Sequence, residues 1–127
     1  MNGKVIYLDN AASVPTRQEA IDAMLSVLEH CYGNPSGAHK MAREARRLID
    51  NARDTLSFGL GCDPKEVIFT GGGTEADNLA IFGVHGSRNG TVVASMTEHH
   101  AVLAPVEQLG GKFVRVHPDG SLDLDHL

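Results

Sequence analysis

The sequence predicts an α/β fold, in which helices flank a mostly parallel sheet. Two observations support this prediction. Through the second half of the chain, short apolar runs alternate with segments of helical periodicity, which is the pattern of strand–helix–strand units. The apolar runs are continuous rather than alternating with polar residues, which is typical of parallel strands buried on both faces.

The composition is ordinary for a globular protein and excludes several classes. The 127 residues fit one domain, and 42% apolar and 21% charged residues are typical of soluble domains. A net charge of −5, with both signs interspersed, disfavours nucleic acid, which needs a basic face. No apolar run approaches the about 20 residues of a membrane span, and Met1–Leu8 does not resemble a secretory leader. We therefore expect a cytoplasmic protein with reduced thiols.

The first half of the chain is predicted to be mainly helical. A short apolar run at 5–8 ends in a polar loop, and a helix follows Pro15, with apolar residues at helical spacing as far as Cys31. The Gly33–Gly37 segment ends this helix, and Asn34 is by default a turn residue there. A second helix over about 38–58 carries one apolar stripe. Its arginine-rich opposite face is interpreted as solvated rather than as an anion site.

The second half supplies the predicted sheet. Strands are expected at 66–69, 91–95 and 113–116, and helices at about 75–84 and 101–109. The helix at 75–84 is apolar nearly all round, so we expect it to be buried on most sides. A turn at 117–120 leads into 121–127, which has the pattern of an element cut at its start.

A glycine loop, Gly71–Gly73, lies between a predicted strand and a predicted helix. Glycine permits close approach of a ligand to the backbone, and a helix that begins directly after such a loop presents free N–H groups to an anion, most often a phosphate. The loop matches neither common nucleotide fingerprint. Thr74 follows with two open interpretations: it caps the helix, with Asp77 in a near capping box, or its hydroxyl and N–H bind the phosphate.

A second polar segment, Glu98–His100, follows the strand predicted at 91–95. Ligands of open α/β sheets gather at the carboxyl ends of strands, so this segment is expected to face the same cavity as the glycine loop. His99 is either an ordinary hydrogen-bonded loop residue or a ring that stacks on a flat cofactor and exchanges protons. Adjacent histidines point in different directions and no further ligand is suitably spaced, so no metal site is predicted. Cys31 and Cys62 are interpreted as small apolar residues.

Four motifs in order resemble the N-terminal part of a cysteine desulfurase, a pyridoxal-phosphate enzyme of the class-V aminotransferase group. They are Tyr7–Ala12, Gly33–Ser36, Val67–Ile81 and Thr97–Leu103. The resemblance covers nearly the whole chain. It implies the fold-type I transferase architecture, with 1–15 as an N-terminal segment and 16–127 as an incomplete part of the cofactor-binding large domain.

The resemblance also implies roles for individual residues. Gly73 and Thr74 would bind the phosphate of pyridoxal 5'-phosphate, and His99 would stack on its pyridine ring and act catalytically in proton transfer. Asn34 would lie near the mouth of the substrate site. The family usually has Ser-Gly-Ala where this chain has Gly71–Gly73, a change that binding through N–H groups should tolerate.

The implied activity is release of sulfur from L-cysteine, leaving L-alanine and an enzyme persulfide for iron–sulfur cluster assembly. The implied partners are sulfur-acceptor or scaffold proteins and, in the full-length family, a second copy in a homodimer; no nucleic acid or membrane is expected. The family's cofactor-bound lysine and persulfide cysteine lie downstream of these motifs, and Lys112, Cys31 and Cys62 do not match them. We therefore expect a fragment that is inactive alone. A non-catalytic phosphate-binding or docking module, and a fragment of a selenocysteine lyase or another class-V relative, stay open as alternatives.

Overall fold

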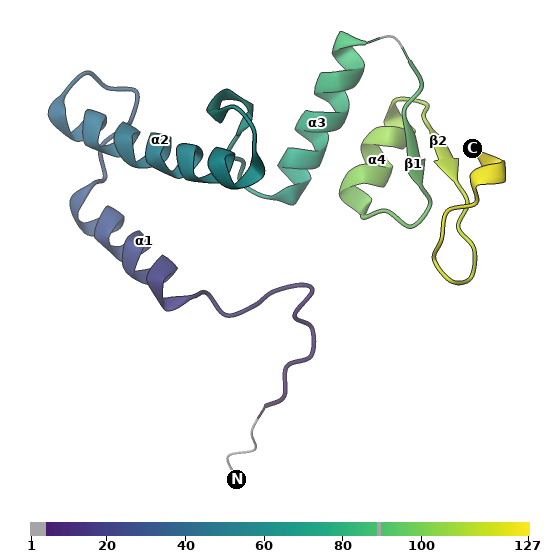
Figure 1. Ribbon diagram of the computed structural model, residues 1–127, viewed down its shortest axis with the longest axis horizontal. Helices are drawn as coiled ribbons and strands as arrows, with labels where there is room; N and C mark the ends of the chain where they lie inside the picture. The colour runs from purple at the N-terminus through teal and green to yellow at the C-terminus, as the bar shows by residue number, and fades with distance from the viewer. Residues whose placement is uncertain (1–4, 89) are drawn as a thin grey trace. The chain divides into compact units, whose positions relative to one another are not determined.

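A computed structural model describes residues 5–88 and 90–127 of the chain. It divides into two compact units, residues 1–67 and residues 68–127, which are treated separately below. Figure 1 shows the elements in order. They are α1 (Gln18–His30), α2 (Lys40–Leu60), η1 (Pro64–Glu66), α3 (Gly73–Ser87), β1 (Val93–Ser95), α4 (His100–Gln108), β2 (Lys112–Val114) and η2 (Leu124–His126).

The first unit contains the two helices that the periodicity predicts. His39 is the N-cap of α2, and its Nδ1 accepts the N–H of Ala42 at 3.3 Å. The helix ends at Gly61, which has a φ of 69° and so adopts the left-handed conformation that glycine favours at helix ends. The loop between the helices folds closely onto α2: a Cβ on Gly33 would lie 2.8 Å from the carbonyl carbon of Met41. Here the glycine is required by close backbone approach.

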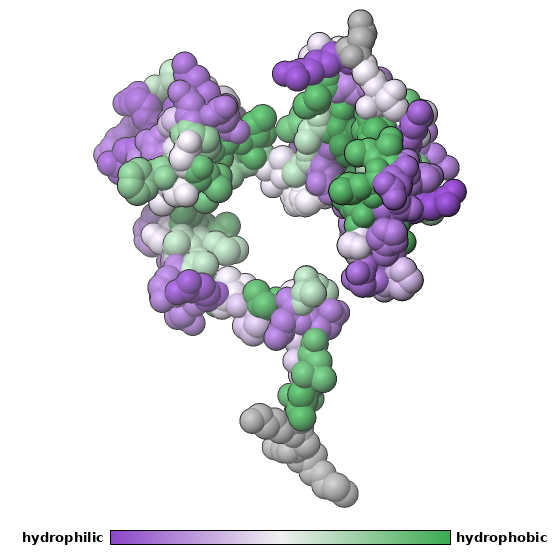
Figure 2. All heavy atoms as spheres, turned by 45° about the vertical axis from the view of Figure 1, so that its right-hand side comes forward, coloured by the Kyte–Doolittle hydropathy of each residue, from purple (hydrophilic) through white to green (hydrophobic). Residues whose placement is uncertain are grey.

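The apolar stripe of α2 is only partly covered. Ala45 is buried and Met41 is half-buried, whereas Leu48, Ile49 and Leu56 are exposed. Figure 2 shows such apolar side chains, in green, at the surface. α1 has no buried residue among its thirteen. Helical periodicity thus predicts the helices correctly, but it does not predict whether another element covers their apolar faces.

The strand predicted at 66–69 is wrong. Glu66 belongs to η1, a 3₁₀ turn in which Asp63 and Glu66 form a capping box. Val67 is extended, with φ −90° and ψ 116°, but 67–70 belong to no strand of the described sheet. An apolar extended segment becomes a strand only when a neighbouring strand accepts and donates its backbone hydrogen bonds. The sequence pattern does not reveal whether such a neighbour is present.

The second unit confirms the parallel sheet. β1 and β2 pair in parallel, with Val93 opposite Lys112 and Ser95 opposite Val114. Both strands are shorter than predicted, at three residues each. α4 connects them and contacts both β1 and α3. The core lies under α4, where Val106 is 1% exposed and Val114 and Ala101 are also buried.

The prediction that the third helix is buried on most sides is wrong. α3 has no buried residue, and Leu79 and Val84 are each about half exposed, at 48% and 57%. In its own unit α3 packs against α4, which covers one side. The remaining apolar surface of α3 has no cover within the second unit.

No helix in the described part of the chain has the length and apolar character needed to cross a membrane.

Candidate functional site

The glycine loop leads directly into α3. The helix is preceded by Gly72 as its N-cap and begins at Gly73, two residues earlier than predicted. The first backbone hydrogen bond of α3 joins the N–H of Ala76 to the carbonyl of Gly72 at 3.1 Å. The N–H groups of Gly73 and Thr74 precede that bond, so the helix itself offers them no acceptor. They form the N–H cluster that the anion interpretation requires.

An anionic oxygen already lies against this loop. Oε2 of Glu75 accepts the N–H of Gly71 at 2.6 Å, which is a short, charge-assisted hydrogen bond. The loop is further held by the Thr70 hydroxyl, which donates to the carbonyl of Gly72 at 3.2 Å. The side-chain amide of Asn78 donates to the carbonyl of Thr74 at 2.8 Å. Glu75 is the site residue that the sequence reasoning missed. Its position could have identified it, because Glu75 is the third residue of α3 and a carboxylate at that position often accepts a backbone N–H just before the helix.

The three glycines are not needed for an unusual backbone conformation; they leave the loop backbone open to a ligand. Gly72 has a φ of 164°, which is extended, and among the described residues the left-handed glycines are Gly61, Gly110 and Gly120. A Cβ on Gly73 would meet nothing within 4 Å. Without side chains, the loop forms one wall of an open depression of about 580 Å³, lined by residues 71–75 and Asn78. A Cβ on Gly71, in contrast, would lie 3.2 Å from Oε2 of Glu75. A family-like Ser-Gly-Ala loop therefore fits this backbone at 72 and 73, and at 71 only if the Glu75 side chain shifts slightly.

The capping interpretation of Thr74 is wrong. Gly72 is the N-cap, no side chain caps the helix, and Thr74 is its second residue. Because the helix begins earlier than predicted, Glu75 rather than Asp77 reaches back to the loop. The Thr74 hydroxyl has no hydrogen-bond partner among the described residues. It is therefore available to a ligand in the depression.

His99 lies just before α4, on the loop that follows β1. Its Nδ1 accepts the N–H of Ala101 at 3.1 Å, which makes His99 the N-cap of α4. With Nδ1 as the acceptor, the proton of the neutral ring resides on Nε2. The residue is exposed. Figure 1 shows that α3 and α4 both begin at the end of the second unit where β1 terminates. The starts of α3 and α4 therefore lie at the same end of this unit. His99 does not line the depression at the glycine loop, so a cavity shared by His99 with Gly73 and Thr74 stays a prediction.

Asn34 belongs to the first unit, and its position relative to the other three residues is not defined. Its Oδ1 accepts the N–H of Ser36 at 3.0 Å, and its carbonyl accepts the N–H of Gly37 at 3.0 Å. These bonds confirm the turn interpretation. The side chain is exposed on the loop before α2.

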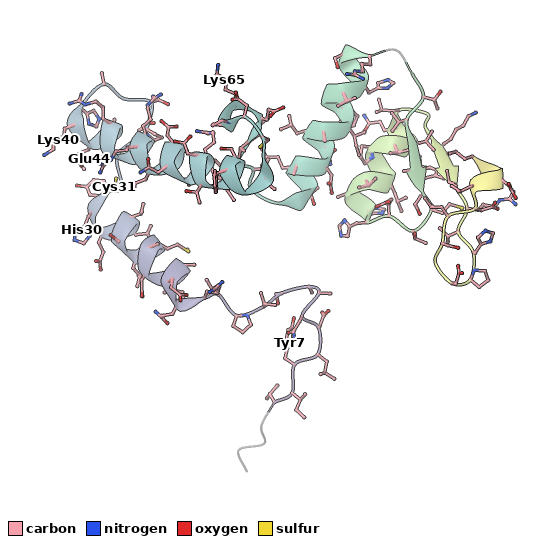
Figure 3. The ribbon with its side chains drawn as sticks, in the orientation of Figure 1. Tyr7, His30, Cys31, Lys40, Glu44 and Lys65 are labelled. Carbon is pink, nitrogen blue, oxygen red and sulfur yellow. The ribbon has the colours of Figure 1, made fainter. Side chains whose placement is uncertain are left out.

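The cysteines and histidines form no candidate metal site in the described residues. Cys31 and Cys62 are free and half-buried, and Figure 3 shows Cys31 directly after His30 where α1 ends. Within residues 5–88 and 90–127, no three His, Cys, Asp or Glu side chains are grouped so as to hold a metal ion.

Comparison with known proteins identifies the class to which this fold and loop belong. The family model of the class-V aminotransferases matches residues 6–127. The chain therefore belongs to the aminotransferase class-V family.

Within that family the similarity is to cysteine desulfurases, which confirms the predicted resemblance. The chain is 40% identical to the cysteine desulfurase IscS of Dictyoglomus turgidum, over 96% of this chain and 33% of that protein. It is 45% identical to an IscS-like cysteine desulfurase of Mycobacterium tuberculosis, over 81% of this chain and 28% of the relative. A solved structure of SspA in complex with cysteine superposes with a TM-score of 0.78 and 34% identity, over 88% of this chain and 34% of that one. The chain spans about a third of the length of these proteins.

Proposed function

We propose that this chain is part of a pyridoxal-phosphate-dependent cysteine desulfurase. The whole enzyme would release sulfur from L-cysteine, leaving L-alanine, and pass it on as a persulfide for iron–sulfur cluster assembly. Relatives that carry the name cysteine desulfurase, and the likeness to SspA in complex with cysteine, support this substrate. In this proposal residues 16–127 form part of the cofactor-binding domain, preceded by a segment at 1–15.

The observation that carries the proposal is the short bond from the Gly71 N–H to Oε2 of Glu75. The carboxylate oxygen stands in for a phosphate oxygen and supports the view that the N–H groups of this loop donate to an anion. Gly73 and Thr74 would hold the phosphate through their N–H groups and the Thr74 hydroxyl. When bound, pyridoxal phosphate supplies the electron sink for chemistry at the substrate's α-carbon.

His99 is proposed to contact the cofactor ring and to serve in proton transfer. Its exposure and its place at the same end of the unit as the loop support this role. Because Nδ1 is engaged by Ala101, Nε2 is the nitrogen that can donate to a ligand. Cofactor stacking would therefore leave the cap on α4 in place.

Several further statements rest on the family resemblance. They are Asn34 near the substrate, a homodimer, sulfur-acceptor or scaffold partners, and a cytoplasmic location. We also expect the 127-residue chain to show no turnover by itself, because neither Lys112 nor either cysteine stands in the family's motifs.

The test is a titration of the purified chain with pyridoxal 5'-phosphate, followed by absorbance and calorimetry, with unphosphorylated pyridoxal as the matched control. We expect saturable binding of the phosphorylated form alone. Borohydride reduction should leave no covalent adduct at the loop-bound cofactor, and L-cysteine should yield no L-alanine. Equal behaviour of the two vitamers would exclude phosphate recognition by the loop.

A non-catalytic phosphate-binding module is the second candidate, because free N–H groups at a helix start can bind an anion without the residues that catalysis needs. Fragment complementation distinguishes the two. The chain would be mixed with the part of the Dictyoglomus turgidum enzyme that it does not match. Formation of L-alanine from L-cysteine by the mixture, and by neither part separately, supports the desulfurase. Cofactor binding with no rescue favours the module.

A further inference from the structure

The Glu75 carboxylate lies in the same depression as the N–H groups that are proposed to bind phosphate. Glu75 and Gly71 both line the 580 Å³ depression, and the bond between them uses one N–H of the loop. Glu75 is exposed, and no cation is paired with it among the described residues. The depression therefore contains N–H donors and one fixed negative charge.

We propose that Glu75 is a built-in competitor that lowers the affinity of the glycine loop for phosphate. This inference rests on the proposed function, since it concerns the same anion site. Two negative charges a few ångströms apart repel, and the loop N–H taken by Glu75 is not available to a phosphate oxygen. The Gly71 N–H is thus satisfied without a ligand, whereas the N–H groups of Gly73 and Thr74 stay free of partners among the described residues, so an incoming phosphate binds beside the carboxylate or displaces it.

A purely structural role is the alternative to competition. A carboxylate in the first turn stabilises a helix through its dipole and by satisfying a backbone donor. That role predicts that Glu75 shapes the loop and has no unfavourable effect on anion binding. The two roles differ in what the charge does, so a variant that keeps the shape and removes the charge separates them.

Glu75→Gln is that variant. The glutamine side chain has the same length, and its amide oxygen can still accept the Gly71 N–H. Asp77→Asn is the matched control: it removes one negative charge from the same helix, two residues further on, but Asp77 does not line the depression. Circular dichroism of each variant would verify that helix content is unchanged.

The experiment measures the dissociation constants of inorganic phosphate and of pyridoxal 5'-phosphate by calorimetry at pH 8, in low and high salt. Glu75→Gln is expected to bind both ligands about threefold to tenfold more tightly than the wild type in low salt. The gain should shrink in high salt, because screening weakens repulsion between exposed charges. Asp77→Asn should change either constant less than twofold.

The outcomes separate the two proposals. Unchanged or weaker binding by Glu75→Gln, with normal binding by the wild type, overturns the competitor role and leaves the proposed function intact. A gain of equal size in Asp77→Asn also overturns it, since the effect would then reflect net charge. Absence of phosphate and cofactor binding in all three proteins overturns the proposed function and this inference together.

Discussion

Nδ1 of His99 accepts the backbone N–H of Ala101 at 3.1 Å, so this imidazole begins α4 while it stands at the carboxyl end of β1. The same ring is the proposed cofactor contact. A substitution at His99 therefore has two separable consequences, one for the helix and one for the ligand.

His99→Ala and His99→Asn separate these consequences. Alanine removes the cap, and we expect the free energy of unfolding to fall by about 0.5–2 kcal/mol. Asparagine is a good N-cap residue and should restore that stability. Both variants lose the ring, so both should bind pyridoxal phosphate more weakly, by about 0.5–1.5 kcal/mol for an aromatic contact.

Thermal unfolding followed by circular dichroism and cofactor titration measure the two effects. His100→Ala is the control, because the neighbouring imidazole has no predicted role. Wild-type cofactor affinity in His99→Asn would show that the ring contributes nothing to binding.

Thr74→Val tests the ligand interpretation of the hydroxyl. Thr74 neither caps α3 nor has a hydroxyl partner among the described residues, so stability should change little. The phosphate, in contrast, would lose a hydrogen bond to a charged group, of about 1.5–3 kcal/mol. Calorimetry should find both inorganic phosphate and pyridoxal phosphate bound at least tenfold more weakly. A large loss of stability with unchanged affinity would return Thr74 to a structural role.

Gly111→Ala and Gly83→Ala should shift stability in opposite directions. A Cβ on Gly111 would lie 2.6 Å from Cγ1 of Val106 and 2.7 Å from the carbonyl oxygen of Val92, so alanine should destabilise the second unit by about 1–3 kcal/mol. Gly83 lies inside α3 with nothing within 4 Å, so alanine there should stabilise by up to about 1 kcal/mol. Urea unfolding compares the two. If Gly111→Ala were stabilising, Gly111, the residue just before β2, would not pack closely against Val106 of α4 as the structure shows.

The turn at 117–121 gives a pH-dependent prediction. The Ser121 hydroxyl donates to Oδ1 of Asp119 at 2.7 Å and the Ser121 N–H at 3.0 Å, and these bonds lower the pKa of the Asp119 carboxyl from its ordinary value. A lowered pKa means that the stabilisation is present at neutral pH and is lost as the pH falls through the folded value. NMR titration should show the Asp119 pKa rising in Ser121→Ala. An unchanged value would mean that the hydroxyl bond is not formed in solution.

Periodicity and turn residues predicted much of the local structure. The helical spacing through Cys31 and along 38–58 gave α1 and α2, and the apolar runs near Val93 and Val114 gave a parallel pair. These features depend on residues close in sequence. The glycine loop directly before a helix was also predicted, because glycines followed by a helix start are a local signal, and phosphate binding there stays a prediction.

The failures concern features that depend on neighbours. Residues 67–70 lack a strand partner in the described sheet, and α3 lacks cover on most of its apolar surface. The N-cap is Gly72 rather than Thr74, and Glu75 accepts the Gly71 N–H, a contact that the capping preference of Thr74 does not reveal. In each case the observed structure depends on a second element or side chain that the local sequence pattern does not include.

The most direct test of the central claim is a titration of the ¹⁵N-labelled chain with pyridoxal 5'-phosphate, followed by the backbone amide signals. The loop and α3 N-terminus are proposed to hold the phosphate, so the largest shifts should fall on Gly73 and Thr74, with smaller ones around His99. Unphosphorylated pyridoxal should leave Gly73 and Thr74 unmoved. Shifts confined to other regions, or identical shifts with both compounds, would contradict the account.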